Sequence, residues 1–248
     1  MRVTVIGCSG SLPGPESAAS CYLLEAAGVR LVLDLGNGAL GALQRHIALG
    51  DLDAVLLSHL HPDHCLDLCG LYVARRYGPE QPTTRIPVWG PPGTAARMAN
   101  GYGLPVDPGM TEEFDFRHYP DAGFEVGPVR IRAARVVHPG QAFALRVEHA
   151  GRVLVYSGDT APSSALVELA GGADVLVCEA GFPDDVDNAP GLHLTGTEAG
   201  EHAQAAGAGR LIVTHVPPWG DPVSARTHAA GAFDGPVELA RPGLVVDV

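Results

Sequence analysis

The residues best able to do chemistry lie in one six-residue stretch, from His59 to His64. The imidazoles of His59, His61 and His64 share it with the carboxylate of Asp63. His59 and His61 are two positions apart on an expected extended segment, so their side chains project to the same side. Pro62 breaks that segment and turns Asp63 and His64 round. Three histidines and an aspartate in one turn have few structural uses, so this stretch predicts metal binding, and one turn can serve two ions.

Further ligands are available where other apolar runs end, at His138, Asp159 and His215. Loops at strand ends are where layered α/β folds gather functional groups. Each of these residues could equally cap a helix or form a hydrogen bond in the core. Imidazole and carboxylate are ligands that zinc, manganese and iron accept, so two divalent ions are expected, with zinc favoured and manganese or iron as alternatives.

In these residues the chain resembles the metallo-beta-lactamase-fold hydrolases. The signature of that family is two histidines and an Asp-His pair in this spacing, then a distant histidine, an aspartate in a Gly-Asp-Thr-like turn, and a last histidine after a strand. All occur here in that order. The resemblance implies that one metal is held by His59, His61 and His138 and the other by Asp63, His64 and His215, with Asp159 bridging the two.

Other stretches indicate a branch of this family. An aspartate bridge in place of a cysteine favours the phosphodiester-cleaving branches over the zinc lactamases. Four stretches resemble tRNase Z and its shorter relatives: residues 7–11, 34–38, 156–160 and 193–198. Three stretches are more similar to actinobacterial cyclic-nucleotide phosphodiesterases of the atypical class II type: residues 57–71, 192–200 and 215–219.

Two features separate the chain from tRNase Z. That family usually carries a long tRNA-grasping arm between its third ligand histidine and the bridging aspartate. Here the matching positions are His138 and Asp159, and the gap fits only a hairpin that turns at Ala150 and Gly151. The 16 basic residues are outnumbered by 28 acidic ones, a net charge of −12, which disfavours a large polyanion as partner. The sequence thus favours a small phosphodiester, without excluding nucleic acid.

The surrounding pattern predicts an α/β (α+β) fold, a four-layer αββα metallo-beta-lactamase sandwich of two mixed β-sheets flanked by helices. Residues 1–248 are expected to form a single domain. Strands are predicted at 3–8, 20–26, 30–35, 129–137, 142–148, 152–156, 175–178 and 211–214. Helices are predicted at 40–49, 65–77, 91–102, 163–170, 196–206 and 222–233, and residues 105–120 remain unassigned.

Composition sets the remaining expectations. No apolar run approaches the roughly 20 residues that span a bilayer, and the chain opens directly on a strand, so a cytoplasmic protein without membrane contact is expected. Five cysteines fit reduced thiols better than disulfides, and buried packing is favoured over a redox or metal site for Cys65 and Cys69. By analogy with relatives, a homodimer is expected.

The expected function is hydrolysis of a 3′,5′-cyclic nucleotide, such as cyclic AMP, to the 5′-monophosphate by a metal-bridging hydroxide. Asp63 would orient that hydroxide and accept its proton. His193 would donate a proton to the leaving oxygen, unless it only caps the helix at 196–206, and Glu179 would orient His193.

Several alternatives stay open. The chain could process tRNA 3′ ends, hydrolyse a lactone, thioester or phosphonate ester on the same metals, or act as a non-catalytic sensor. Arg75 and Arg76 could reach a phosphate, although cations at a solvated helix end are favoured. Trp219 could stack on a nucleobase at the mouth of the site or pack at an oligomer contact.

Overall fold

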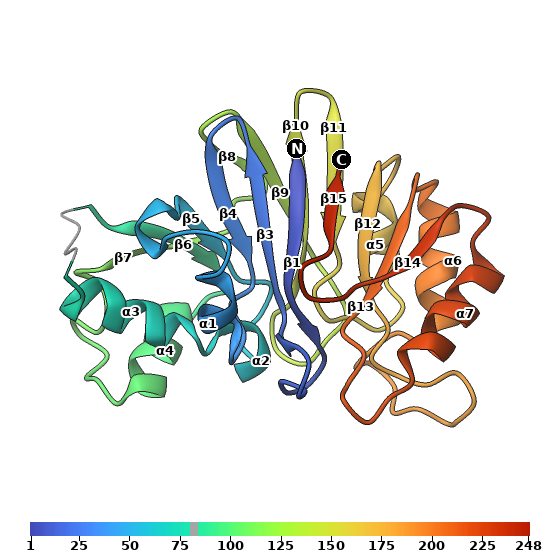
Figure 1. Cartoon of the computed structure of the whole chain (residues 1–248), viewed down its shortest axis with the longest axis horizontal. Helices are drawn as coiled ribbons and strands as arrows, with labels where there is room; N and C mark the ends of the chain where they lie inside the picture. Colours follow the sequence, from blue (N-terminus) through green and yellow to red (C-terminus); the bar gives the residue numbers. More distant parts are fainter. Residues whose placement is uncertain (80–83) are drawn as a thin grey trace.

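Two mixed β-sheets face each other in the computed structural model, which describes residues 1–79 and 84–248 (Figure 1). The first sheet runs in the order β15-β1-β3-β4-β5-β6-β7, with β2 beside β1. Its strands are β1 (Arg2–Ser9), β2 (Ala18–Ala19), β3 (Cys21–Ala26), β4 (Val29–Leu33), β5 (Ala54–Leu56), β6 (Ile86–Gly90), β7 (Phe114–His118) and β15 (Val245–Asp247).

The second sheet runs in the order β14-β13-β12-β11-β10-β9-β8. Its strands are β8 (Phe124–Val126), β9 (Val129–Arg135), β10 (Phe143–His149), β11 (Arg152–Tyr156), β12 (Val175–Glu179), β13 (Leu211–Thr214) and β14 (Val237–Leu239). In both sheets an antiparallel part gives way to a parallel part, at β4–β5 in the first and at β11–β12 in the second.

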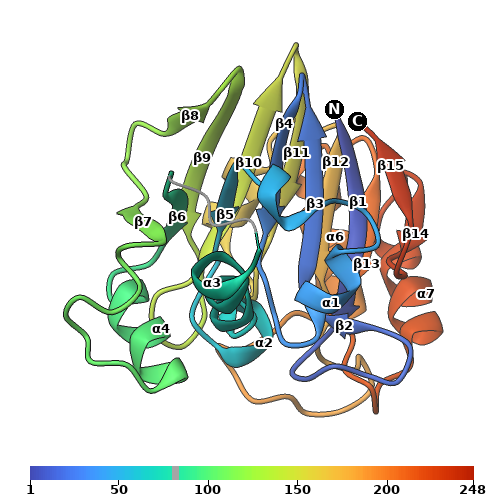
Figure 2. The same ribbon diagram turned by 60° about the vertical axis from the view of Figure 1, so that its left-hand side comes forward.

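Helices cover the outer face of each sheet. Figures 1 and 2 place α1, α3 and α4 on the side of the first sheet and α5, α6 and α7 on the side of the second. The helices are α1 (Ala39–Leu43), α2 (Pro62–Cys65), α3 (Leu68–Tyr77), α4 (Thr94–Tyr102), α5 (Ser164–Leu169), α6 (Gly196–Ala206) and α7 (Pro222–Ala232), with a 3-10 turn at Leu49–Asp51. Among the described residues, none of these helices has the length and apolar character to cross a membrane.

Alternating strand residues create the layers. Leu24 and Leu31 of the first sheet pack against Leu145 and Leu154 of the second in one buried cluster between the sheets. Their neighbours in sequence, such as Leu23 and Val32, point outward into a second cluster under the helices of the first half. Because strand side chains alternate between faces, each sheet buries both of its faces. The predicted four-layer fold is therefore confirmed.

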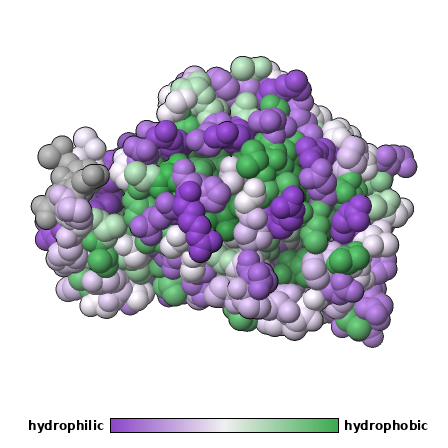
Figure 3. Space-filling model, in the orientation of Figure 1, coloured by the Kyte–Doolittle hydropathy of each residue, from purple (hydrophilic) through white to green (hydrophobic). Residues whose placement is uncertain are grey.

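The outer surface is mixed in character. Figure 3 shows hydrophilic residues spread over the face seen in Figure 1, with hydrophobic residues between them. Val245 of β15 is one of the larger apolar side chains exposed to solvent.

The hairpin between His138 and Asp159 has the predicted form. Strands β10 and β11 pair antiparallel from Leu145–Tyr156 to His149–Arg152. Ala150 and Gly151 join them with φ angles of 50° and 76°, as a tight two-residue hairpin turn requires. This segment therefore holds no inserted arm.

Three predicted helices differ from the structure by more than one residue at an end. The helix expected at 40–49 is only α1, because the N–H groups of Arg45 and His46 bond three residues back and tighten the chain. The helix expected at 65–77 is divided into α2 and α3, since the N–H of Asp67 bonds to Leu35 rather than continuing the helix. The helix expected from Pro91 begins at Thr94, after Gly93 with φ of 91°.

Candidate metal centre

The first two histidines leave β5 on an extended segment. Strand β5 ends at Leu56, and His61 still has extended φ and ψ of −68° and 150°. The two side chains therefore lie on one side, with Nε2 of His59 3.0 Å from Nδ1 of His61. Pro62 then occupies the first turn of α2, where a missing N–H costs nothing, and redirects the chain.

Asp63 and His64 lie in α2 and are both buried. The carbonyl of His64 accepts a hydrogen bond from the N–H of Leu35, at 2.8 Å. Gly36 is packed so closely that a Cβ there would lie 1.9 Å from the carbonyl oxygen of Asp63. Glycine at position 36 is therefore needed for α2 to lie against the β4–α1 connection.

The second sheet brings three more residues to the same place. His138 follows β9, Asp159 follows β11 and His215 follows β13. Strands β11, β12 and β13 are parallel neighbours, so their carboxyl ends meet at one edge. His215 has φ of 60°, a conformation that a non-glycine residue adopts at some cost.

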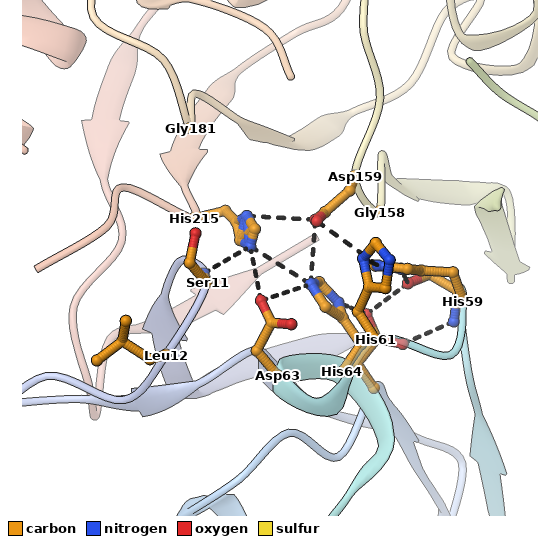
Figure 4. Close-up of polar contacts among 12 residues, drawn as sticks. Ser11, Leu12, His59, His61, Asp63, His64, Gly158, Asp159, Gly181 and His215 are labelled. Carbon is orange, nitrogen blue, oxygen red and sulfur yellow. Dashed lines mark hydrogen bonds and ion pairs between the residues drawn. The ribbon is translucent and has the colours of Figure 1, made fainter. Parts of the chain in front are cut away.

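Together these seven residues form two groups that share one carboxylate. His59, His61 and His138 form the first group with Asp159, and Asp63, His64 and His215 form the second with Asp159; one potential ligand atom from each residue lies within 4.8 Å of the others in its group. Figure 4 shows Asp159 between His215 and the histidines of the β5–α2 turn.

The two oxygens of Asp159 face different groups. Oδ2 is 3.6 Å from Nε2 of His59 and 3.9 Å from Nε2 of His138. Oδ1 is 3.1 Å from Nε2 of His64 and 3.2 Å from Nδ1 of His215. This is the arrangement expected of a carboxylate that bridges two ions.

Two buried atoms test whether metal ions fit. Among the described residues, Oδ1 of Asp159 and Nδ1 of His215 are buried and have no hydrogen-bond partner, although they lie only 3.2 Å apart. A buried polar atom without a partner costs roughly 1–3 kcal/mol, and a shared cation would satisfy both atoms at once. With nitrogen and carboxylate donors throughout, the groups fit borderline divalent ions.

Asp34, at the end of β4, supports the centre from behind and was not recognised as a functional residue from the sequence. Its buried carboxylate lies 2.7 Å from Nδ1 of His64 and accepts hydrogen bonds from the N–H and hydroxyl of Ser58 and the hydroxyl of Tyr156. Such a carboxylate orients a ligand histidine and leaves its other nitrogen free for a metal.

Burial and charge set the protonation of the ligands. Burial lowers the pKa of His59 and of His138, so both imidazoles are neutral. Burial alone would raise the pKa of Asp63, but the hydrogen bond and charge of His64 lower it to about 2. Burial is likewise outweighed at Asp159, where His215 and His64 hold the pKa well below its usual value. Both carboxylates are therefore ionised at neutral pH.

His193 lies at the edge of this centre, 16% exposed at its side chain. Its Nδ1 is 3.0 Å from Oε1 of Glu179 and 3.9 Å from Oδ2 of Asp159. Burial would lower the pKa of His193, but the hydrogen bond and charge of Glu179 raise it to about 9. Helix α6 is instead capped by Thr195, whose side chain forms a capping box with Glu198.

Glu179 is held in turn by the surrounding backbone. It is fully buried at the end of β12 and accepts hydrogen bonds from the N–H groups of Thr160 and Gly181. These bonds fix its carboxylate toward His193, and the orienting role of Glu179 stays a prediction.

The remaining residues singled out from the sequence lie away from the centre or pack structurally. The buried Arg75 donates to the carbonyl of Thr84, and Arg76 pairs with Glu112 and Glu113, so neither guanidinium is aimed at the ligands. Cys65 and Cys69 are free thiols, and burial raises the pKa of both. The remaining histidines take no part in the two ligand groups: His46, His118, His149, His202 and His228.

Comparisons with known proteins identify the family. The model of the beta-lactamase superfamily domain matches residues 30–216. An uncharacterized protein of Mycobacterium leprae is 46% identical over 100% of this chain and 89% of its own length. A ribonuclease Z of Mycobacterium sp. (strain KMS) is 32% identical over 96% of this chain and 93% of its own length.

A solved structure agrees with this. The probable metallo-hydrolase YhfI of Bacillus subtilis is 31% identical over 99% of both proteins. Its crystal structure superposes with a TM-score of 0.88 at 29% identity, covering 99% of this chain and 98% of that one. The chain therefore belongs to the beta-lactamase superfamily and is a metal-dependent hydrolase.

Proposed function

We propose that the protein hydrolyses a small phosphodiester with two divalent metal ions, and that its substrate is a 3′,5′-cyclic nucleotide such as cyclic AMP. The observation that carries the proposal is Asp159, whose two oxygens face two separate ligand groups. Paired ions suit phosphodiesters because they stabilise both the attacking and the leaving oxygen of an in-line displacement.

The residues divide between the two ions as the groups do. His59, His61 and His138 would hold one ion and Asp63, His64 and His215 the other, with Asp159 shared. Ions bound there would supply Lewis acidity toward the phosphoryl oxygens and make a bound water more acidic. The excess of nitrogen donors favours zinc, with manganese and iron as alternatives.

Proton transfer falls to two side chains at the centre. As water attacks phosphorus and the bond to the 3′ oxygen breaks, Asp63, ionised at neutral pH, takes the proton that the water loses. His193, kept protonated by Glu179, gives a proton to the departing 3′ oxygen. The product is the nucleoside 5′-monophosphate.

Processing of tRNA 3′ ends is the second candidate, since a relative 32% identical is named ribonuclease Z. Two observations favour the small substrate over it. The segment from His138 to Asp159 is a tight hairpin, and the chain carries a net charge of −12. Tight RNA binding depends largely on basic groups that neutralise phosphates. The cytoplasmic location and the homodimer stay predictions.

One assay separates these candidates. Protein reconstituted with zinc, and separately with manganese, is given cyclic AMP and, in parallel, precursor tRNA. We expect 5′-AMP to form, and Asp63→Ala to lower the rate by at least about a hundredfold. Asp121→Ala, which removes an exposed carboxylate, is the matched control and should match the wild type. Faster cleavage of precursor tRNA than of cyclic AMP, or full activity in Asp63→Ala, would refute the proposal.

A further inference from the structure

A cavity of about 300 Å³ lies between the loops that follow β12 and β13. Gly181 and Phe182 line it from the first loop, and Val216 and Trp219 line it from the second. Small-molecule sites in proteins begin at about this volume. The cavity is therefore large enough to receive part of a substrate.

The lining of the cavity includes neighbours of residues at the candidate metal centre. Val216 directly follows His215, and a Cβ on Gly181 would lie 3.0 Å from Cγ of His193. The rings of Phe182 and His193 are 5.1 Å apart, edge to face. The cavity therefore lies next to His193, the residue at the edge of the centre.

Trp219 presents an aromatic surface at this cavity. Trp219 is 70% exposed, the largest value among the exposed large apolar residues of the described chain. The N–H of Gly220 bonds to the carbonyl of Pro217 at 2.8 Å, which closes a turn with Pro218 at its second position. The turn and its proline hold the backbone that carries the indole at the cavity.

The charged groups that line the cavity are carboxylates. Carboxylates of Asp184, Asp185 and Asp221 line it, and the described lining residues include no arginine or lysine. Asp184 accepts hydrogen bonds from the N–H groups at the start of α6, and Asp221 caps α7. The exposed Asp185 is the carboxylate best placed to meet a ligand in solution. Ionised carboxylates accept hydrogen bonds and donate none, and they repel phosphate.

We infer that this cavity receives the nucleobase of the substrate, stacked on Trp219 and chosen for an edge that donates hydrogen bonds. The inference rests on the proposed function, which puts the phosphodiester at the metals. Adenine presents an amino group, whereas the oxygen at the same edge of a uracil ring is an acceptor and faces repulsion from carboxylates. The base of the substrate would thus lie in the negatively charged cavity, and its phosphate would lie at the metal centre.

The kinetic test compares cyclic AMP with cyclic UMP. In Trp219→Ala the KM for cyclic AMP should rise by about 5- to 150-fold, the worth of one stacked base, while kcat changes much less. Trp219→Phe should restore most of the loss. Tyr77→Ala removes a similarly exposed aromatic from α3 and should leave KM unchanged. In Asp185→Asn the preference for cyclic AMP over cyclic UMP should fall, because an amide can donate to the uracil oxygen.

A binding test keeps this inference separate from the catalytic proposal. The chain has two tryptophans, and Trp89 is buried, so Trp219 emission in metal-reconstituted protein reports stacking. We expect 5′-AMP to quench that emission at lower concentration than 5′-UMP, and Trp219→Phe to abolish the change. Equal affinity for the two nucleotides, or an unchanged KM in Trp219→Ala, would overturn the base site. Quenching by 5′-AMP without turnover of cyclic AMP would support the base site and refute the phosphodiesterase.

Discussion

The two halves of the molecule supply the metal centre in different ways. In the first half, the four ligand residues all lie in the stretch 59–64 that follows β5. Pro62 and the short α2 determine how their side chains are oriented. In the second half, His138, Asp159 and His215 come from three separate strand ends. The first arrangement depends on local backbone geometry, and the second depends on the order in which the strands of a sheet pair.

Each half also has a buried carboxylate at a strand end that holds a histidine. Asp34 lies 2.7 Å from His64 in the first half, and Glu179 lies 3.0 Å from His193 in the second. His64 is fully buried, whereas the side chain of His193 keeps 16% of its surface exposed. The same device therefore orients a ligand on one side and, on the other, a histidine that a substrate can reach.

The largest effect is expected where the halves meet. Asp159→Ala removes the only residue common to both ligand groups, so we expect both ions to be lost and activity to fall to background. Asp63→Ala affects one group and should retain about one ion per chain. Metal content by mass spectrometry under native conditions checks both variants.

The control for this comparison is chemical. Chelation of the wild type should abolish activity, and added zinc or manganese should restore it there but not in Asp159→Ala. Retention of two ions by Asp159→Ala would show that the two halves bind metal independently.

The next largest effect concerns the exposed histidine of the second half. His193→Ala should lower kcat for cyclic AMP by about 10²- to 10⁴-fold, the usual contribution of a general acid. The kcat for bis-p-nitrophenyl phosphate should fall much less, because its leaving phenolate needs no proton. Parallel assays of the two substrates check this, and an equal loss on both would assign His193 a purely structural role.

Glu179→Gln sharpens the same point. The amide can still form a hydrogen bond with His193, but it has no negative charge to stabilise the protonated imidazole. The pKa of His193 should therefore fall, and the alkaline limb of the rate profile should move to lower pH. A profile identical to that of the wild type would contradict the assigned role of Glu179.

The sequence alone predicted the parts that depend on local pattern. The turn at 59–64, the hairpin at Ala150 and Gly151, and the bounds of α6 follow from spacing, turn chemistry and capping, all contained in a few neighbouring residues. The ends of β9, β11 and β13 could be predicted because apolar runs stop there. Their gathering in one place was expected from the way layered α/β folds use strand ends, whereas their division between two ions came only from the resemblance to a known family.

The parts that were missed depend on long-range pairing. A single aspartate after a strand looks like any turn residue, and Asp34 becomes functional only because the two sheets bring Ser58 and Tyr156 to it. Strand β6 was not predicted; it contains Pro87, but its pairing with β5 begins only at Val88, so the missing N–H of the proline breaks no bond to β5. Strand β7 lies within the unassigned residues 105–120, where the sequence pattern is irregular, and it is held by pairing with β6.

A smaller effect is expected from the carboxylate behind the first half. Asp34→Asn keeps the size and shape of the side chain but weakens its hydrogen bond to His64. Metal affinity and activity should therefore fall by about 10- to 100-fold. Competition with a coloured chelator measures the affinity. Asp53→Asn is the matched control, because it alters an exposed carboxylate that accepts a hydrogen bond from the N–H of Arg30, the one such bond among the described residues. Unchanged affinity in Asp34→Asn would show that the packing of α2 alone orients His64.

The smallest effect is expected in the loop that carries His193. Burial would raise the pKa of Asp184, but hydrogen bonds from Thr197 at the start of α6 lower it. A carboxyl group whose pKa is lower in the folded than in the unfolded chain stabilises the fold above its unfolded-state pKa and loses that contribution as pH falls. Asp184→Asn should therefore cost about 0.5–1 kcal/mol at pH 7, the worth of a charge at a helix N-terminus, and progressively less below about pH 4. Urea unfolding at stepped pH measures the difference, with the exposed Asp187→Asn as control. If the difference in unfolding free energy does not change with pH, Asp184 acts through its shape and not through its charge. The second half would then hold this loop by packing, as the first half holds α2.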